Sequence, residues 1–270
     1  MKDLHIHTKY SDGEYDEFEI LEEIKKSGIT EFAISDHDTI EGSKRVFDIL
    51  KNTKHNFIFH SGIELTCRFN EFACGVNMHI LVYDFDYGNK NIISIIDKIS
   101  RLRRQKVDKM VKFVEEIYKI KIPQGLLDEK LKNTKSFGKP HLYAIMCEMG
   151  NFDREQYYRN MDKLSTSEFK LDTKDTILKL KGAGKIVLAH PIEIMKEYNY
   201  NIETLKKLVA KLKELGLNGI ECYHSSQTKE IQIKLSEIAH KYDLFETMGS
   251  DFHGPNVKPG LKIGDVQKYN

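Results

Sequence analysis

The stretch MKDLHIHTKYSDGEYDEFEILEEIKKSGITEFAISDHD, residues 1–38, contains two short apolar segments separated by an amphipathic one. Residues 2–6 and 31–35 have the length and composition of buried strands, and Phe18, Leu21 and Ile24 recur at helical spacing between them. A strand, a helix and a second strand in this order are typical of a parallel β-α-β unit. The first segment of the chain therefore predicts an α/β fold.

The same alternation continues through most of the chain. Further strands are expected at residues 57–65, 78–83, 186–189, 219–223 and 244–248, and further helices at residues 40–52, 173–183, 202–215 and 229–242. Seven apolar strands alternating with helices of period 3.6 predict a parallel sheet covered by helices. A closed barrel is the geometry that we favour.

The middle of the chain breaks this alternation. Residues 89–171 are highly charged and contain no convincing strand, and their periodicity predicts helices at residues 92–118, 126–132 and 141–149. Because the alternating pattern resumes afterwards, we interpret residues 89–171 as a helical insertion in a barrel formed by residues 1–88 and 172–270.

The composition limits the possible partners. The 270 residues include 42 Lys and Arg against 41 Asp and Glu, a net charge of +1, so the chain has no general attraction for a polyanion or an anionic membrane. Its apolar runs are too short to span a bilayer, and its start lacks the apolar core of a signal peptide. Four cysteines without paired spacing are typical of reduced thiols. We expect a cytoplasmic protein that binds neither a membrane nor a long nucleic acid.

Many of the eleven histidines lie at the ends of the predicted strands, together with carboxylates. In a barrel of parallel strands, those ends meet at one mouth. A single His-x-His pair would be explained equally well by core packing, and Asp36-His37-Asp38 by a helix N-cap. The coincidence at five strand ends instead predicts a centre for Zn, Mn or Fe. The residues concerned are His5, His7, Asp12, His37, Glu64, His79, His190, Asp251 and His253.

These segments resemble the polymerase and histidinol phosphatase (PHP) family. The resemblance rests on residues 3–8 with 11–13, on 35–39, 62–64, 79–81 and 189–191, and on 249–253, in the family's order. It implies a distorted (β/α)7 barrel that holds two or three divalent metal ions and hydrolyses phosphate esters. Within the family, the chain looks most like the small bacterial phosphoesterases that act on nucleoside 3′,5′-bisphosphates or on the 5′ ends of oligoribonucleotides.

Carried over residue by residue, the resemblance implies three metal positions. His5, His7, Glu64 and Asp251 would hold the first, and Glu64 would bridge to a second completed by His79 and His190. Asp12, His37 and His253 would form the third. Some relatives have a histidine where Asp12 stands, and a carboxylate there favours a harder ion such as Mn or Mg.

Metal ions of this kind lower the pKa of a bound water, so that hydroxide attacks phosphorus and no Ser or Cys nucleophile is needed. Either a metal ion would stabilise the leaving alkoxide or a nearby acid would protonate it. Asp38 and His224 are both candidates for that acid, with a surface turn as the alternative for His224. Candidate phosphate-binding residues lie in the insertion, which we expect to roof the active site. Arg101 and Arg104 share a helix face, where a solvated charged surface is the alternative. Lys139 and His141 follow Gly138, where an ordinary helix start is the alternative; relatives carry Arg in place of Lys139.

The sequence therefore predicts a metal-dependent phosphoesterase that releases phosphate from a nucleoside 5′-phosphate or 3′,5′-bisphosphate, with a short oligoribonucleotide as a further possible substrate. Histidinol-phosphate phosphatase is the alternative within the same chemistry. The alternative of another class is a non-catalytic metal-binding module. The full set of ligand positions argues against this alternative.

Overall fold

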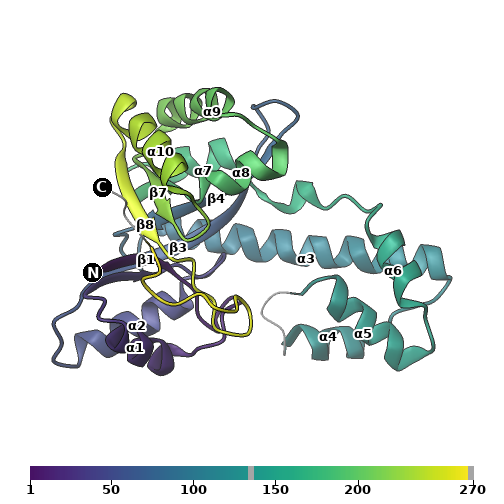
Figure 1. Cartoon of the computed structure of the whole chain (residues 1–270). Helices are drawn as coiled ribbons and strands as arrows, with labels where there is room; N and C mark the ends of the chain where they lie inside the picture. Colours follow the sequence, from purple (N-terminus) through teal and green to yellow (C-terminus); the bar gives the residue numbers. More distant parts are fainter. Residues whose placement is uncertain (133–136, 267–270) are drawn as a thin grey trace. The chain divides into compact units, whose positions relative to one another are not determined.

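In the computed structural model, which describes residues 1–132 and 137–266, one β-sheet is accompanied by helices (Figure 1). Its strands follow the order β1-β2-β3-β4-β6-β7-β8, and the short β5 pairs with β3. Their bounds are β1 Lys2–Ile6, β2 Glu31–Ile34, β3 Ile58–Phe69, β4 Val76–Tyr83, β5 Leu171–Asp172, β6 Lys185–Leu188, β7 Gly219–His224 and β8 Phe245–Gly249.

The first and last strands meet, so the sheet curls into a nearly closed barrel. Ile6 forms a parallel bridge with Phe252, which follows β8. The Asp251 N–H donates to the His5 carbonyl at 2.8 Å, and the His7 N–H donates to the Phe252 carbonyl at 2.9 Å. The α/β class and the barrel geometry expected from the sequence are confirmed.

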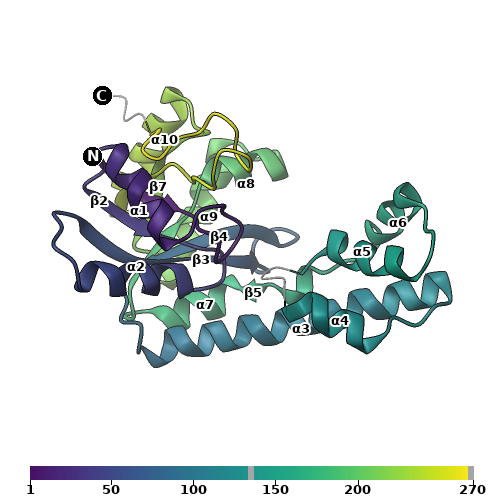
Figure 2. The same ribbon diagram turned by 90° about the horizontal axis from the view of Figure 1, so that it is seen from below.

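The expectation of a wholly parallel sheet is wrong at β4. This strand runs antiparallel to both of its neighbours, β3 and β6. Residues 70–75 alone connect β3 to β4, and so short a connection can join only antiparallel strands. The two strands lie side by side as a long pair (Figure 2).

Helices of the barrel unit cover the sheet, with α1 and α2 on one side of the strands and α7 to α10 on the other (Figure 1). Ile20 and Ile24 of α1 are fully buried, and Asp16 and Glu19 form a capping box at its start. The bounds are α1 Glu17–Lys26, α2 Glu41–Lys51, α7 Thr173–Leu180, α8 Pro191–Tyr198, α9 Ile202–Leu215 and α10 Lys229–Lys241.

The contacts divide the chain into a barrel unit, Met1–Ile96 with Leu171–Asn270, and a helical unit, Asp97–Lys170. The helical unit contains most of α3 (Lys90–Tyr118), then α4 (Gln124–Lys132), α5 (Lys139–Met149), α6 (Arg154–Met161) and the 3-10 turn η1 (Ser167–Phe169). Its own core includes Val114, Leu142, Met146 and Tyr157. Helix α6 was not predicted from the sequence, because its residues are strongly polar.

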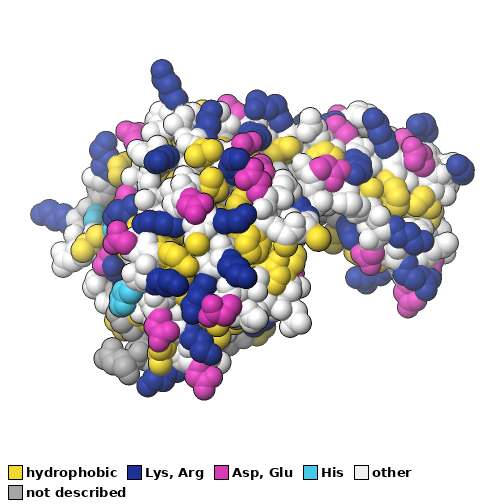
Figure 3. Space-filling view, turned by 90° about the horizontal axis from the view of Figure 1, so that it is seen from above, with side chains coloured by type: hydrophobic (Ala, Val, Ile, Leu, Met, Phe, Trp, Pro, Cys, Tyr) yellow, Lys and Arg dark blue, Asp and Glu magenta, His cyan; other side chains and the backbone are white. Residues whose placement is uncertain are grey.

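The surface carries both signs of charge. On the face shown in Figure 3, Lys and Arg side chains are scattered among Asp and Glu side chains. Among the described helices, none combines the length and the apolar composition that a membrane crossing requires.

Candidate metal centre

The polar residues at the strand ends converge inside the barrel unit. His5 lies within β1 and His7 directly after it, His37 follows β2, and Glu64 lies within β3. His190 follows β6, while Asp251 and His253 follow β8. His79 lies near the start of β4 rather than its end, and it reaches the same place because β4 is antiparallel to its neighbours. The one departure from a parallel barrel thus supplies a further imidazole.

Glu64 is at the centre of this cluster. Its side chain is fully buried, and five imidazole nitrogens surround its two oxygens. Oε2 lies 3.0 Å from His5 Nε2, 3.2 Å from His7 Nε2 and 3.1 Å from His37 Nδ1. Oε1 lies 2.9 Å from both His79 Nδ1 and His190 Nε2. So many nitrogens cannot all donate to one carboxylate.

The donor set fits divalent metal ions. Within the described residues, His5 Nε2, His7 Nε2 and Glu64 Oε2 are buried and have no hydrogen-bond partner of acceptable geometry. Leaving buried polar atoms unsatisfied is costly, and a bound cation satisfies them. Imidazole nitrogens mixed with carboxylate oxygens are ligands typical of Zn, Mn and Fe. Divalent ions therefore match both the burial and the chemistry of these atoms.

Three groups have ligand atoms close enough together to share an ion: His5, His7, Glu64 and Asp251; His7, Asp12, His37 and His253; and His37, Glu64 and His79. The first is the set that the sequence analysis assigned to one metal. The second contains the predicted third set, with His7 added. In the third, His37 replaces the predicted His190, although His190 Nε2 still lies 2.9 Å from Glu64 Oε1.

Charges within the cluster shift its proton affinities. Burial alone would raise the pKa of Glu64, but the imidazoles of His37, His5 and His79 outweigh burial and hold the pKa well below its usual range. The same competition holds the pKa of Asp251 well below its usual range, chiefly through His5, His224 and His7. Burial lowers the pKa of His37 to about 3. Burial alone would lower the pKa of His5 and of His7, but neighbouring carboxylates outweigh it and raise the pKa of His5 well above its usual range and that of His7 to about 9. A metal ion would therefore displace protons from these rings on binding.

The backbone is unusual where these residues leave the strands. Asp38, His190 and Asp251 have φ angles of 55°, 23° and 57°, in the left-handed region that non-glycine residues rarely occupy. The Asp38 N–H donates to the Glu64 carbonyl at 2.8 Å, and the Asp38 Oδ1 accepts from the Thr66 N–H at 2.8 Å. Asp38 is therefore committed to holding β3 in place.

The second candidate acid, His224, lies at the end of β7 and is almost fully buried. Its Nε2 lies 3.4 Å from Asp251 Oδ2, and its Nδ1 lies 2.8 Å from the Ser226 hydroxyl. The surface turn considered as its alternative does not describe this position. His224 is thus the candidate acid that directly adjoins the cluster.

Sequence reasoning missed four charged residues of the cluster's surroundings. Asp3, Asp36 and Glu221 are fully buried, and Lys258 forms an ion pair with Asp251 Oδ2. Asp36 accepts hydrogen bonds from the Thr8 N–H, the Thr8 hydroxyl and the Ser11 hydroxyl, each at 2.7 Å. An acidic residue inside an otherwise apolar strand, as at Glu221, is the signal that identifies such positions.

The candidate phosphate-binding residues Arg101, Arg104, Lys139 and His141 all belong to the helical unit. Arg104 Nε lies 3.1 Å from Asp108 Oδ1, and Lys139 Nζ lies 2.6 Å from Asp162 Oδ1. Lys139 begins α5, and His141 Nδ1 accepts from the Gly138 N–H at 3.1 Å. The segment 138–141 is therefore a helix start, the alternative considered from the sequence. A role in binding phosphate stays a prediction for these four residues.

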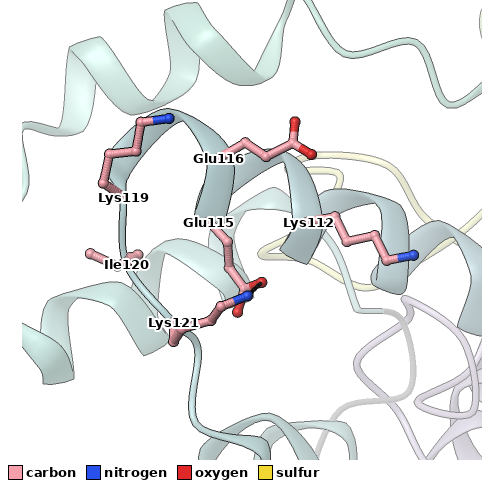
Figure 4. Close-up of a pocket in the computed structure, with 6 residues that line it drawn as sticks. All are labelled: Lys112, Glu115, Glu116, Lys119, Ile120 and Lys121. Atoms are coloured by element: carbon pink, nitrogen blue, oxygen red, sulfur yellow. Dashed lines mark hydrogen bonds and ion pairs between the residues drawn. The ribbon is translucent and has the colours of Figure 1, made fainter.

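The described part of the helical unit has at least two hollows on its surface. One, of about 270 Å³, is lined by Arg103, Arg104 and Lys106 together with apolar side chains that include Val107 and Phe137. The other, of about 470 Å³, lies where α3 ends and is lined by Lys112, Glu115, Glu116, Lys119, Ile120 and Lys121 (Figure 4). In the second, Lys121 Nζ lies 3.0 Å from Glu115 Oε2, so part of the charge on its wall is already neutralised.

Comparison with known proteins gives concordant results. A model of the PHP domain matches residues 3–203. A 5′-3′ exoribonuclease from Haemophilus influenzae is 26% identical over 94% of this chain and 90% of its own length. A phosphoribosyl 1,2-cyclic phosphate 1,2-diphosphodiesterase from Eggerthella lenta is also 26% identical, over 94% of each chain. A 3′,5′-nucleoside bisphosphate phosphatase from Chromobacterium violaceum is 21% identical over 98% of this chain and 91% of its own length.

The fold also matches a solved structure. An amidohydrolase from Chromobacterium violaceum superposes with a TM-score of 0.72 at 20% sequence identity, covering 100% of this chain and 92% of that one.

Proposed function

This chain belongs to the PHP domain family, and from that premise we propose that it hydrolyses a phosphate monoester of a small nucleotide, a nucleoside 5′-phosphate or 3′,5′-bisphosphate. The chain is a metal-dependent phosphoric ester hydrolase, as its family and the named relatives support. The arrangement that carries the proposal is the convergence of five imidazole nitrogens on the buried carboxylate of Glu64.

Divalent ions bound to this cluster would supply a Lewis acid that activates water near neutral pH and offsets the charge of a phosphate. His5, His7, Glu64 and Asp251 would hold one ion, with Glu64 shared with a second position that His79 and His190 complete. Asp12, His37 and His253 would form a third. Asp12 is half exposed, so this third position is the most accessible to solvent.

The chain's own side chains would serve the leaving group. His224 adjoins Asp251 and can deliver a proton, whereas the Oδ1 of Asp38 already accepts the Thr66 N–H. We therefore favour His224 over Asp38 as the acid. Arg101, Arg104, Lys139 and His141 remain the proposed phosphate-binding residues, and their substitution by Ala should raise KM more than it lowers kcat.

The nucleotide substrate is supported by the relatives that are named as an exoribonuclease and as a nucleoside bisphosphate phosphatase. A decisive assay measures phosphate release, with Mn²⁺ or Zn²⁺, from a nucleoside 5′-phosphate, a 3′,5′-bisphosphate, a short 5′-phosphorylated oligoribonucleotide and histidinol phosphate. The proposal expects the highest kcat/KM on one of the two small nucleotides. A clear preference for histidinol phosphate would overturn it.

The same assay needs variants that separate catalysis from folding. His5→Ala and Asp251→Ala each remove a proposed ligand, and we expect more than about a 100-fold loss of turnover, since even the supports of metal ligands contribute 10- to 100-fold. Circular dichroism should show that the fold is retained. Turnover near that of the wild type in either metal-supplemented variant would refute the metal mechanism.

A cyclic phosphodiester is a second candidate substrate, because the Eggerthella lenta relative matches 94% of both chains. A five-membered cyclic ribose phosphate should be added to the panel. Ring opening faster than monoester hydrolysis would make the enzyme a phosphodiesterase instead.

A further inference from the structure

The Glu221 carboxylate contacts two histidines of the cluster at once. Glu221 lies in β7, where it follows Ile220 and precedes Cys222 in the sequence, and its side chain is fully buried. Its Oε1 lies 2.9 Å from His5 Nδ1, and its Oε2 accepts a hydrogen bond from the His190 backbone N–H at 2.7 Å. The two oxygens therefore meet one donor each, from the ends of β1 and β6.

The contact with His5 determines which ring nitrogen is available for a metal. Of the two ring nitrogens, Nδ1 forms a hydrogen bond with Glu221, whereas Nε2 has no partner of hydrogen-bonding geometry. A carboxylate accepts, so Nδ1 donates, and Nε2 is the nitrogen left to bind an ion. That Nε2 lies 3.0 Å from Glu64 Oε2 and 3.6 Å from Asp251 Oδ1. Glu221 thus holds the ring in the tautomer and orientation that present Nε2 to the proposed ligands.

The contact with His190 acts through the backbone. His190 has a φ of 23°, an unusual conformation that needs support from its surroundings. The hydrogen bond from its N–H to Glu221 supports that conformation, and the ring then places Nε2 2.9 Å from Glu64 Oε1. One carboxylate therefore orients histidines that face opposite oxygens of Glu64.

The space around the paired side chains of Glu221 and His5 is tightly filled. A Cβ atom added at Gly249 would lie 2.1 Å from the His5 Cβ and 2.8 Å from Glu221 Oε1. Gly249 is the register partner of His224 on the neighbouring strand. The absence of a side chain at this position leaves space for the Glu221–His5 pair, whose members come from β7 and β1, the two strands that flank β8.

We propose that Glu221 is a positioning residue that orients His5 and His190 together for metal binding, coupling the first and second metal positions. This inference rests on the metal-dependent function proposed above. Both of its partners are N–H donors, so both need an acceptor. Glutamine has the same shape but offers one oxygen and one NH₂ group, and therefore leaves one of the two donors without an acceptor.

The test is titration of the metal-free protein with Co²⁺, followed by visible absorption, which reports ligand geometry. Glu221→Gln should weaken Co²⁺ binding by about 10- to 100-fold and change the absorption bands, the effect typical of losing a carboxylate behind a ligand histidine. The matched control is Glu246→Gln on β8, whose carboxylate accepts a hydrogen bond from the Tyr223 hydroxyl at 2.8 Å and lies outside the three ligand groups. That variant should bind Co²⁺ like the wild type.

The outcomes separate the two claims. If the wild type binds Co²⁺ and Glu221→Gln binds it equally well with the same spectrum, the role of Glu221 is refuted and the metal-dependent function stands. If the wild type itself binds no metal, both the role of Glu221 and the metal-dependent function are refuted. If Glu221→Gln fails to fold, the role of Glu221 is tested in the wild-type protein by ¹⁵N-histidine NMR with Zn²⁺ in place of Co²⁺. The spectrum should show a slowly exchanging Nδ1–H. This signal should be absent from His5→Gln. A His5 ring protonated at Nε2 would overturn the proposal.

Discussion

The position of His224 gives the clearest difference between two residues that the sequence left as equals. Its ring lies between Asp251 and the Ser226 hydroxyl, and Ser226 in turn donates to Glu193 Oε1 at 3.1 Å. Asp38, by contrast, holds the backbone of β3 through Thr66. An acid acts on the leaving group alone, whereas a structural residue affects every substrate alike.

The leaving group therefore supplies the test. In His224→Gln, kcat for a nucleoside monophosphate should fall by about 10²- to 10⁴-fold, the usual contribution of a general acid. With p-nitrophenyl phosphate the loss should be far smaller, because p-nitrophenolate departs without a proton. Asp38→Asn is the control and should affect both substrates to a similar extent. Equal losses on both substrates in His224→Gln would exclude its role as the acid.

At this scale the sequence predicted the residues that carry the chemistry but not those that support them. Motifs such as His5-Ile6-His7 and Asp36-His37-Asp38 are visible because polar residues lie within an apolar strand or directly follow one. Glu221 and Lys258 belong to no such motif, and their contacts depend on strands brought together by the fold. The pairing of the cluster's atoms, such as His37 with His79 rather than His190, depends on side-chain directions that spacing does not determine.

Among the elements, β1 and β8 lie so close together that one methyl group added at Gly249 should lower the stability of the fold. Gly249→Ala places its Cβ 2.1 Å from the His5 Cβ, and relief of this clash requires movement of a strand. We expect a loss of about 1–3 kcal/mol in the free energy of unfolding, as for other overpacked interiors. Urea denaturation followed by circular dichroism measures it.

Gly88→Ala provides the comparison. Gly88 is exposed in the same unit, and a Cβ there would meet only the Asp86 side chain, at 3.2 Å. Gly88→Ala should change the free energy of unfolding by no more than about 0.5 kcal/mol, as for most surface substitutions. If Gly249→Ala is equally mild, the close approach of β8 to β1 is not a constraint on the fold.

A chain of charges runs along the edge of the sheet where β1, β2, β3 and β6 begin and the antiparallel β4 ends. Lys2, Glu31, His60, Asp84 and Lys185 form successive contacts of 2.7, 3.1, 2.6 and 2.8 Å. Burial alone would raise the pKa of Glu31 and of Asp84, but hydrogen bonds from Lys2, Lys185 and His60 outweigh it and lower both pKa values. A carboxyl whose pKa is lowered by folding stabilises the folded state above its ordinary pKa.

The pH dependence of this chain of charges has a definite sign. The stabilisation is complete above the ordinary pKa values of about 4 and is lost as the pH falls through the lowered values of the folded state. Glu31→Gln and Asp84→Asn should each cost about 0.5–1 kcal/mol at pH 7, and the difference from the wild type should shrink below pH 3. Urea denaturation at both pH values measures it, with Glu23→Gln on α1 as a surface control. If either variant lost the same free energy of unfolding at both pH values, the electrostatic origin of this stabilisation would be contradicted.

Most of the elements could be predicted in order and type, because their strands are short apolar runs and their helices have an apolar stripe. The expected helix at residues 202–215 coincides with α9, and the expected strand at residues 2–6 with β1. The direction of β4 could not be predicted, since a buried strand has the same composition whether it runs parallel or antiparallel. The polar helix α6 was missed because only Tyr157 and Met161 of it are buried.

For the molecule as a whole, metal binding should be a major source of stability. A ligand that binds only the folded state adds about 2.7 kcal/mol at a concentration 100 times its Kd. Calorimetry should show that Mn²⁺ or Zn²⁺ raises the melting temperature of the wild-type protein and that EDTA reverses the change. His5→Ala should show a smaller rise in the melting temperature, since it lacks a ligand of one of the three proposed positions. A melting temperature independent of metal would contradict binding at the cluster.

The near-neutral surface also limits the electrostatic attraction between the protein and its substrate. With a net charge of +1 and both signs scattered over the face in Figure 3, the protein offers little long-range attraction to a phosphate. The positive charge that would meet the substrate is concentrated in the proposed ions, which a count of Lys and Arg does not include.

The closure of the barrel has a consequence for biosynthesis. Asp3 Oδ1 accepts the Ser250 N–H at 2.9 Å across 247 residues of sequence, beside the pair of His5 and Asp251. While a ribosome is still adding the last strand, the nascent chain already carries His5, His7 and Glu64 but lacks Asp251. The first proposed metal position therefore cannot be complete until translation has passed residue 251. Completion of the proposed first metal position would thus be a late step in maturation, and a prematurely terminated chain would leave its histidines without their last carboxylate.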